Sequence, residues 1–348
     1  MSTQSTLFDN FKKSKVNVIT YNKKGEKNSN HYKQFKNICR MTQMKLKDYL
    51  IERLCEYYDE VYADDGFIYV KGTNSNVLLT AHMDTVHEPQ GRICTDIYEY
   101  YDKKNKRHIL SSPQGIGGDD RCGIYAIIKI LETTEFRPYI IFCEDEEIGG
   151  VGSNKFCKTI LSDEVAKEVN FMIEIDRANA NDAVFYEETN EDFQKYVMEV
   201  TGTKEAWGSF SDICNLSEET KVSSFNISSG YYNAHTTDEY VVMEELETCI
   251  DRVIKLIKAN KEDDKKFEYV EYVYSSSSKY YDYSYGYGYG YGKSYGYKDV
   301  CVEFMFYGKD GKDYVEAVDG ESFEECVGSF LMSHSNLSWN DVVDYYEC

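Results

Sequence analysis

Four consecutive acidic residues, Glu144 to Glu147, directly follow an apolar run that begins at Tyr139. The apolar run is typical of a buried strand, so the acids would lie at its carboxyl end. Carboxylates packed this closely repel one another unless a cation offsets their charge. In an acidic protein the same residues also fit a solvated surface loop. Taken alone, the stretch therefore indicates either a cation site or an exposed loop.

A second apolar run, residues 76–81, leads into His82 and Asp84. Residues i and i+2 of a strand share a face, so Asp84 can reach the imidazole of His82. A carboxylate behind a histidine fixes its tautomer and makes it a better metal ligand. The alternative is that His82 is an ordinary core residue with a satisfied ring.

Three further residues have a similar setting. Asp119 lies among glycines just before the apolar helical pattern 124–131, Asp176 ends the apolar run 169–175, and His235 follows a turn after residues 224–230. An aspartate before a helix can also be a plain N-cap. Together, two histidines and several carboxylates at strand ends or tight turns are typical of a metal site.

Alternating strands and helices must position these residues. We expect strands at 60–63, 67–70, 76–82, 139–143, 169–177, 197–200 and 224–230, and helices at 42–54, 124–131, 163–168, from 209 onward and 243–259. This alternation predicts a three-layer α/β/α sandwich with a mixed, largely parallel central sheet. Ligands of such sheets bind beyond the carboxyl ends of the strands, where the candidate residues fall.

The composition narrows the function classes. The 348 residues include 39 basic and 61 acidic side chains, giving a net charge of -22, which disfavours nucleic acid or an anionic membrane as a partner. No apolar stretch is long enough for a membrane-spanning helix, and the N-terminus lacks a signal-peptide pattern. The 11 cysteines include no CxxC pair, so we expect reduced thiols and a cytoplasmic protein.

The chain divides into four predicted parts. Residues 1–40 form a polar N-terminal tail, 41–262 the α/β domain, 263–298 a linker rich in Ser, Tyr and Gly, and 299–348 a small C-terminal module. The linker composition predicts a flexible or self-associating segment. In the module we expect a hairpin at 300–318 and short helices near 323–332 and 339–346. A role of this module in binding another protein stays open.

Five motifs, in this order, resemble those of the co-catalytic zinc exopeptidases, the clan that holds the M20, M28 and M42 metallopeptidases. They lie at residues 79–84, 118–123, 145–149, 174–176 and 233–239. The resemblance covers roughly residues 42–260. The interval between Asp176 and His235 is too short for the dimerisation insertion of M20 enzymes. The resemblance therefore implies a minimal catalytic domain without that lid.

The resemblance also implies a role for each candidate residue. His82 and Asp176 would hold one divalent metal ion, Glu147 and His235 a second, and Asp119 would bridge both; Asp84 would support His82, Glu146 would be the general base, and the peptide bond after Asp119 would be cis. The expected ions are two Zn²⁺, because zinc accepts histidine nitrogen and carboxylate oxygen. Such a pair can share a water whose proton Glu146 accepts.

The expected function is a di-zinc exopeptidase, an aminopeptidase that hydrolyses short peptides. One alternative is an N-acyl amino acid deacylase or related amidohydrolase on the same fold, and another is an inactive metallopeptidase-like binding protein. Four other acids are candidates for holding a substrate's α-ammonium group: Glu144, Asp145, Asp212 and Glu239.

Overall fold

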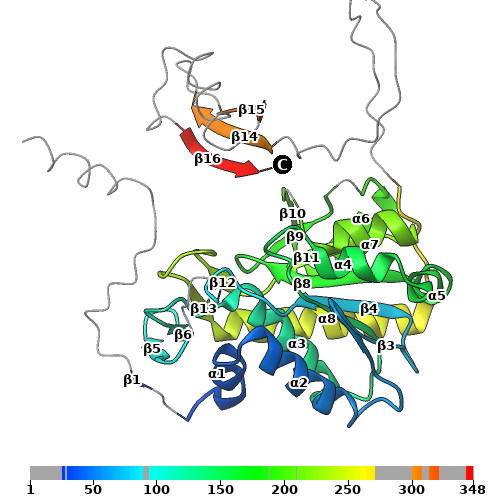
Figure 1. The fold of residues 1–348 in the computed structure, drawn as a ribbon, viewed down its shortest axis with the longest axis horizontal. Coiled ribbons are helices and arrows are strands. Elements are labelled where there is room, and N and C mark those ends of the chain that lie inside the picture. Colours follow the sequence, from blue (N-terminus) through cyan, green and yellow to red (C-terminus); the bar gives the residue numbers. More distant parts are fainter. Residues whose placement is uncertain are drawn as a thin grey trace, which may run out of the picture. The chain divides into compact units, whose positions relative to one another are not determined.

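The computed structural model describes residues 26–27, 30–88, 94–186, 188–208, 210–270, 300–307, 313–320 and 342–347 (Figure 1). The chain divides into two compact units, Met1–Tyr272 and Val273–Cys348. The Tyr/Gly repeats of the predicted linker and the helix predicted near 323–332 lie outside the described residues. Most of the predicted N-terminal tail lies outside them as well.

The first unit is built on an eight-stranded sheet of order β10-β9-β11-β8-β4-β7-β3-β2. The strands are β2 Tyr62–Asp64, β3 Phe67–Val70, β4 Val77–His82, β7 Tyr139–Cys143, β8 Phe171–Arg177, β9 Asp182–Val184, β10 Lys204–Ala206 and β11 Ser224–Ser228. The central strands β7, β4, β8 and β11 run parallel to one another, whereas β3 and β2 add antiparallel at one edge. The prediction of a mixed, largely parallel sheet is confirmed.

Helices cover both faces of this sheet. Those on one face are α1 Lys33–Cys39, α2 Gln43–Leu54, α3 Gly118–Thr133, α6 Glu191–Thr201 and α8 Met243–Asp263; those on the other are α4 Val151–Cys157, α5 Ile160–Glu168 and α7 Asp212–Thr220. Figure 1 shows α2 and α3 below the strands and α4 and α7 above them. Alternate strand residues fill the two cores, as with Phe171 and Ile173 on one side of β8 and Met172 on the other. The three-layer sandwich is confirmed.

None of the helices in the described ranges combines the length and apolar composition that crossing a membrane requires. The eight cysteines whose side chains are described carry free thiols.

A second, antiparallel sheet of five strands stands beside the main one, in the order β1-β5-β6-β13-β12. Its strands are β1 Glu26–Lys27, β5 Tyr98–Asp102, β6 Arg107–Ser111, β12 Tyr231–Tyr232 and β13 Tyr240–Val242. Pairing of β13 with β6 brings the loop that carries His235 next to the segment before α3.

Three sequence predictions about the first unit are wrong. Residues assigned to the polar tail form α1, because Phe35 and Ile38 at helical spacing are fully buried in the core. The predicted linker begins too early, because Phe267 packs on Phe193 and its N–H donates to Asn170. The strand predicted at 197–200 belongs to α6, where Phe193, Val197 and Thr201 are buried at four-residue intervals.

The second unit is a three-stranded antiparallel sheet of order β15-β14-β16. The hairpin of β14 Val300–Tyr307 and β15 Asp313–Gly320 confirms the prediction for this region. The helix predicted near 339–346 is wrong, since β16 Val342–Glu347 pairs with β14. Two valines and two tyrosines within β16 favour a strand.

Replacing Phe35 tests whether α1 belongs to the folded core. The substitution Phe35→Ala should lower the free energy of unfolding by about 3–5 kcal/mol, because it leaves a cavity in a packed core. Met44→Ala in the neighbouring helix is the control; Met44 is 72% exposed, so its loss should change stability little. Urea titration measures both variants. Equal, small effects would show that α1 is not part of the cooperative fold.

Candidate metal centre

All five predicted metal ligands meet at the carboxyl edge of the main sheet. His82 is the last residue of β4, Asp176 is near the end of β8, and Glu147 follows β7 within one turn. Asp119 lies in the first turn of α3, and His235 lies on the loop between β12 and β13. Parallel strands bring such strand ends together at one edge of a sheet, which explains why these side chains meet.

Asp119 lies between the two histidines. Its Oδ1 is 3.0 Å from Nε2 of His82, and its Oδ2 is 3.2 Å from Nε2 of His235. Each carboxylate oxygen therefore faces a different imidazole, which is the arrangement of a bridging ligand. The Asp119–Asp120 peptide bond is cis, as the resemblance implied.

A further acid completes each half of the centre. Oδ1 of Asp176 is 3.6 Å from Nε2 of His82, and Oε2 of Glu147 is 3.0 Å from Nε2 of His235. Oε1 of Glu147 is buried and has no hydrogen-bond partner among the residues that the structure describes. A donor set of imidazole nitrogen and carboxylate oxygen is the one that Zn²⁺ accepts. The residues present therefore fit two divalent ions.

Asp84 connects His82 with the acidic stretch. Its Oδ1 is 3.1 Å from Nδ1 of His82 and accepts the N–H of Glu146 at 3.0 Å, while Oδ2 accepts the N–H of Glu147 at 3.1 Å. One carboxylate thus orients the imidazole and fixes the backbone of both glutamates. The net effect of burial, which opposes ionisation, and of the His82 contact is to lower the pKa of Asp84.

Burial and crowding shift the titration of the centre. Burial, together with the charge of Asp119, raises the pKa of Asp176 to about 8. Burial also raises the pKa of Glu146 and Glu147. Hydrogen bonds to Asp119 and Glu147 raise the pKa of His235 to about 11. Several negative charges share a small buried volume, and protons or cations must offset them.

Asp120 holds the backbone of the centre in place. This role was not predicted. It is fully buried; its Oδ2 accepts the N–H of His82 at 3.3 Å and its Oδ1 the N–H of Gly123 at 2.8 Å. Burial raises its pKa well above the ordinary value. Its position next to Asp119 is the feature of the sequence that could have indicated this role.

Glu174 and Asp212 are two further buried acids close to the centre. Glu174 accepts the N–H of Ile213 at 3.3 Å, and Asp212 accepts the hydroxyl of Ser153 at 2.6 Å. Burial raises the pKa of Glu174 well above its usual range and that of Asp212 to about 6. Glu174 is two residues from Asp176 on one strand, so strand periodicity could have found it.

Glu239 holds the turn that presents Asp119. It is fully buried, and it accepts the N–H of Gly117 at 2.8 Å and of Asp119 at 3.0 Å. Nε2 of His87 lies 3.1 Å from Oε2 of Glu239. The His87 ring occupies the space where a side chain at position 115 would begin, so Gly115 is required there. Sequence reasoning missed this pair.

The four acids considered for a substrate's α-ammonium group all have partners within the protein. Glu144 contacts Lys47 at 3.0 Å and accepts the N–H of Gly66 at 2.6 Å, and Asp145 accepts the side-chain N–H of Gln43 at 3.0 Å. Asp212 and Glu239 are fully buried. Each of the four carboxylates thus already binds a group of the protein, and their role toward a substrate stays a prediction.

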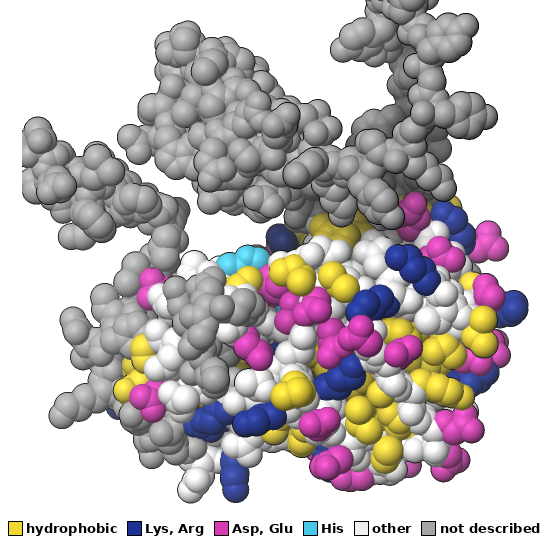
Figure 2. All heavy atoms as spheres, viewed as in Figure 1, with side chains coloured by type: hydrophobic (Ala, Val, Ile, Leu, Met, Phe, Trp, Pro, Cys, Tyr) yellow, Lys and Arg dark blue, Asp and Glu magenta, His cyan; other side chains and the backbone are white. Residues whose placement is uncertain are grey.

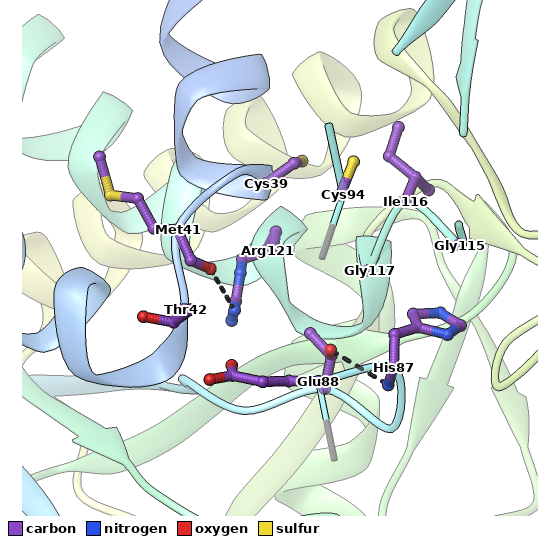
Figure 3. Close-up of a pocket in the computed structure, with 11 residues that line it drawn as sticks. Cys39, Met41, Thr42, His87, Glu88, Cys94, Gly115, Ile116, Gly117 and Arg121 are labelled. Atoms are coloured by element: carbon purple, nitrogen blue, oxygen red, sulfur yellow. Dashed lines mark hydrogen bonds between the residues drawn. The ribbon is translucent and has the colours of Figure 1, made fainter. Parts of the chain in front are cut away.

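A small cavity lies behind the centre (Figure 3). Its volume is about 20 Å³, enough for roughly one water, so a peptide cannot occupy it. The buried Arg121 projects along it, donates to the carbonyl of Met41 at 3.2 Å, and also contacts the carbonyls of Met83 and Asp84. Arg121 therefore fixes the chain immediately after His82.

The open side of the centre is at His235, whose side chain is 57% exposed. Acidic side chains are spread over the visible face of the molecule among lysines and arginines (Figure 2).

A thiol nucleophile does not fit this site, because burial raises the pKa of Cys122 and Cys143 well above the ordinary value.

No protein-family model and no curated protein matches the chain. Among solved structures, a tripeptidase from Staphylococcus aureus is similar with a TM-score of 0.51 and 13% identity, over 66% of this chain and 97% of that one. Aminopeptidase PepT from Bacillus cereus gives 0.50 and 14%, over 67% and 98%. A TET aminopeptidase from a marine sediment archaeon, Thaumarchaeota archaeon, gives 0.50 and 13%, over 66% and 98%. At these identities the similarity establishes a shared fold.

Removing Glu239 should destabilise the turn that carries Asp119. Glu239→Ala leaves two N–H groups and the His87 ring without their buried acceptor, so the free energy of unfolding should fall by about 3 kcal/mol or more. Asp238→Ala, at the exposed neighbouring position, is the matched control and should be nearly neutral. Thermal and urea unfolding measure both. Similar stabilities for the two variants would contradict the assigned role.

Proposed function

We propose that this chain is a di-zinc exopeptidase, an aminopeptidase that acts on short peptides. The observation that carries the proposal is the Asp119 carboxylate between His82 and His235, with a second acid beside each histidine. The fold shared with a tripeptidase and two aminopeptidases supports the same reading. The intact set of candidate ligands favours it over an inactive binding protein.

The chain would hold one ion with His82, Asp119 and Asp176 and the other with Asp119, Glu147 and His235. Two divalent ions in such a centre polarise a carbonyl and lower the pKa of water. Asp84 keeps Nε2 of His82 directed to the centre by holding Nδ1. Glu239 and Arg121 keep the two loops that carry Asp119 and Asp84 in place.

Glu146 is the proposed general base. Its backbone is anchored on Asp84, beside Glu147, so one glutamate can bind metal while its neighbour stays available for proton transfer. Burial raises its pKa, which makes it a stronger base than an exposed glutamate. Its carboxylate would take a proton from the attacking water and deliver it to the departing amine.

Substrate class separates this proposal from its alternatives. Purified protein would be analysed for metal content and assayed with aminoacyl-nitroanilides, di- and tripeptides, and N-acyl amino acids. Hydrolysis of unblocked peptides by protein that holds at least two metal equivalents per chain supports the aminopeptidase. Cleavage of only N-acyl amino acids would establish the deacylase instead. Absence of both metal and hydrolysis would refute the enzyme.

The variant Glu146→Gln should bind metal like the wild type but lose turnover. Removing a general base lowers the rate by about 10²–10⁴-fold, while the ligands stay intact. Glu52→Gln, on the exposed side of α2, is the control and should keep full activity. Metal analysis and steady-state assays on the same samples provide both readouts. Wild-type turnover in Glu146→Gln would remove this residue from the mechanism.

Zinc binding to the metal-free protein should release protons at neutral pH. The raised pKa values of His82 and His235 keep both rings protonated there without metal, and a protonated imidazole cannot bind an ion. Zinc affinity should therefore fall as the pH is lowered. Calorimetric titrations in buffers of different ionisation enthalpy count the protons. Binding with no proton release would contradict the assignment of these two rings as ligands.

A further inference from the structure

A second histidine–carboxylate cluster lies outside the proposed catalytic centre. It contains His31 just before α1, Glu99 in β5 and His108 in β6, and one ligand atom of each lies within 4.8 Å of the others. Nδ1 of His31 is 2.9 Å from Oε1 of Glu99. The cluster shares no residue with the centre around Asp119.

The His108 ring is held in a defined orientation. Its Nδ1 is 2.7 Å from Oε1 of Glu244, and its backbone N–H donates to Oε2 of the same glutamate at 2.7 Å. Tyr101 and Tyr32 flank the ring, with centroids 4.7 Å and 5.6 Å away. A histidine whose one nitrogen contacts a carboxylate presents the other to a metal, which is the usual arrangement of a metal-bound imidazole.

Glu99 is also fixed in place. It is nearly buried, and its Oε2 accepts from Nζ of the buried Lys36 at 2.7 Å, so its Oε1 is the oxygen that faces His31. Glu244 and Glu247 add negative charge close by. Their charges and that of Glu99 all act on the hydroxyl of Tyr32. The local charge therefore favours a cation in addition to Lys36.

We propose that His31, Glu99 and His108 form a separate site for one divalent transition-metal ion, with Zn²⁺ as the best match to two imidazoles and one carboxylate. Three protein ligands leave one position for solvent, on the side where the His31 side chain is 69% exposed. The ion would tie the segment before α1 to the β5–β6 hairpin, and through Glu244 to α8. The alternative is that His31 and Glu99 form an ordinary ion pair that binds no metal.

Metal stoichiometry tests the site directly. Full-length protein would be freed of metal, equilibrated by dialysis against buffered Zn²⁺, and analysed for bound zinc. We expect His31→Ala to bind one equivalent per chain less than the wild type. Lys33→Ala, an exposed neighbour in α1 that offers no ligand here, is the matched control and should bind as much as the wild type. Equal zinc content in wild type and His31→Ala would overturn the proposal.

Two further measurements keep this test decisive. His31 is largely exposed, so circular dichroism should show an unchanged fold in His31→Ala, and a second variant, His108→Ala, should lose the same equivalent. In the background of His235→Ala, which removes a proposed catalytic ligand, the equivalent that depends on His31 should remain. Its presence there, even if no peptide is hydrolysed, separates this inference from the proposed function. Its loss there would show that only one kind of centre exists.

Discussion

The carboxylate of Asp119 is the constraint on which the rest of the centre depends. Each of its oxygens faces a histidine, 3.0 Å from His82 on one side and 3.2 Å from His235 on the other. Concentrating further acids beside it is unfavourable in a buried volume unless positive charge compensates. The proposed pair of cations would offset the crowding of Asp119 with Glu147 and Asp176.

Much of the surrounding structure serves to hold that one carboxylate and its partners in place. Glu239 accepts the N–H of Asp119, Asp120 accepts the N–H of His82, and Asp84 orients the His82 ring while anchoring the backbone of Glu146. Buried, hydrogen-bonded acids of this kind are costly unless each has its partner. Their number indicates that these acids serve to hold the candidate ligands in place, and do not serve stability alone.

The sequence indicated which candidate side chains come together, because strand ends and tight turns can be recognised locally. His82, Glu147 and Asp176 each follow an apolar run, and parallel strands bring such ends together. Contacts between distant segments were not predictable in this way: His87 and Glu239 are 152 positions apart. For the same reason the five-stranded sheet, the core role of Phe35 and the packing of Phe267 were found only in the structure.

Anomalous diffraction from crystals grown with zinc, recorded at the zinc absorption edge, tests the central claim most directly. We expect two peaks that share Asp119 as a ligand, one also contacted by His82 and Asp176 and the other by Glu147 and His235. A structure in which well-ordered Asp119 contacts no metal, or only a single ion lies in the centre, would contradict it.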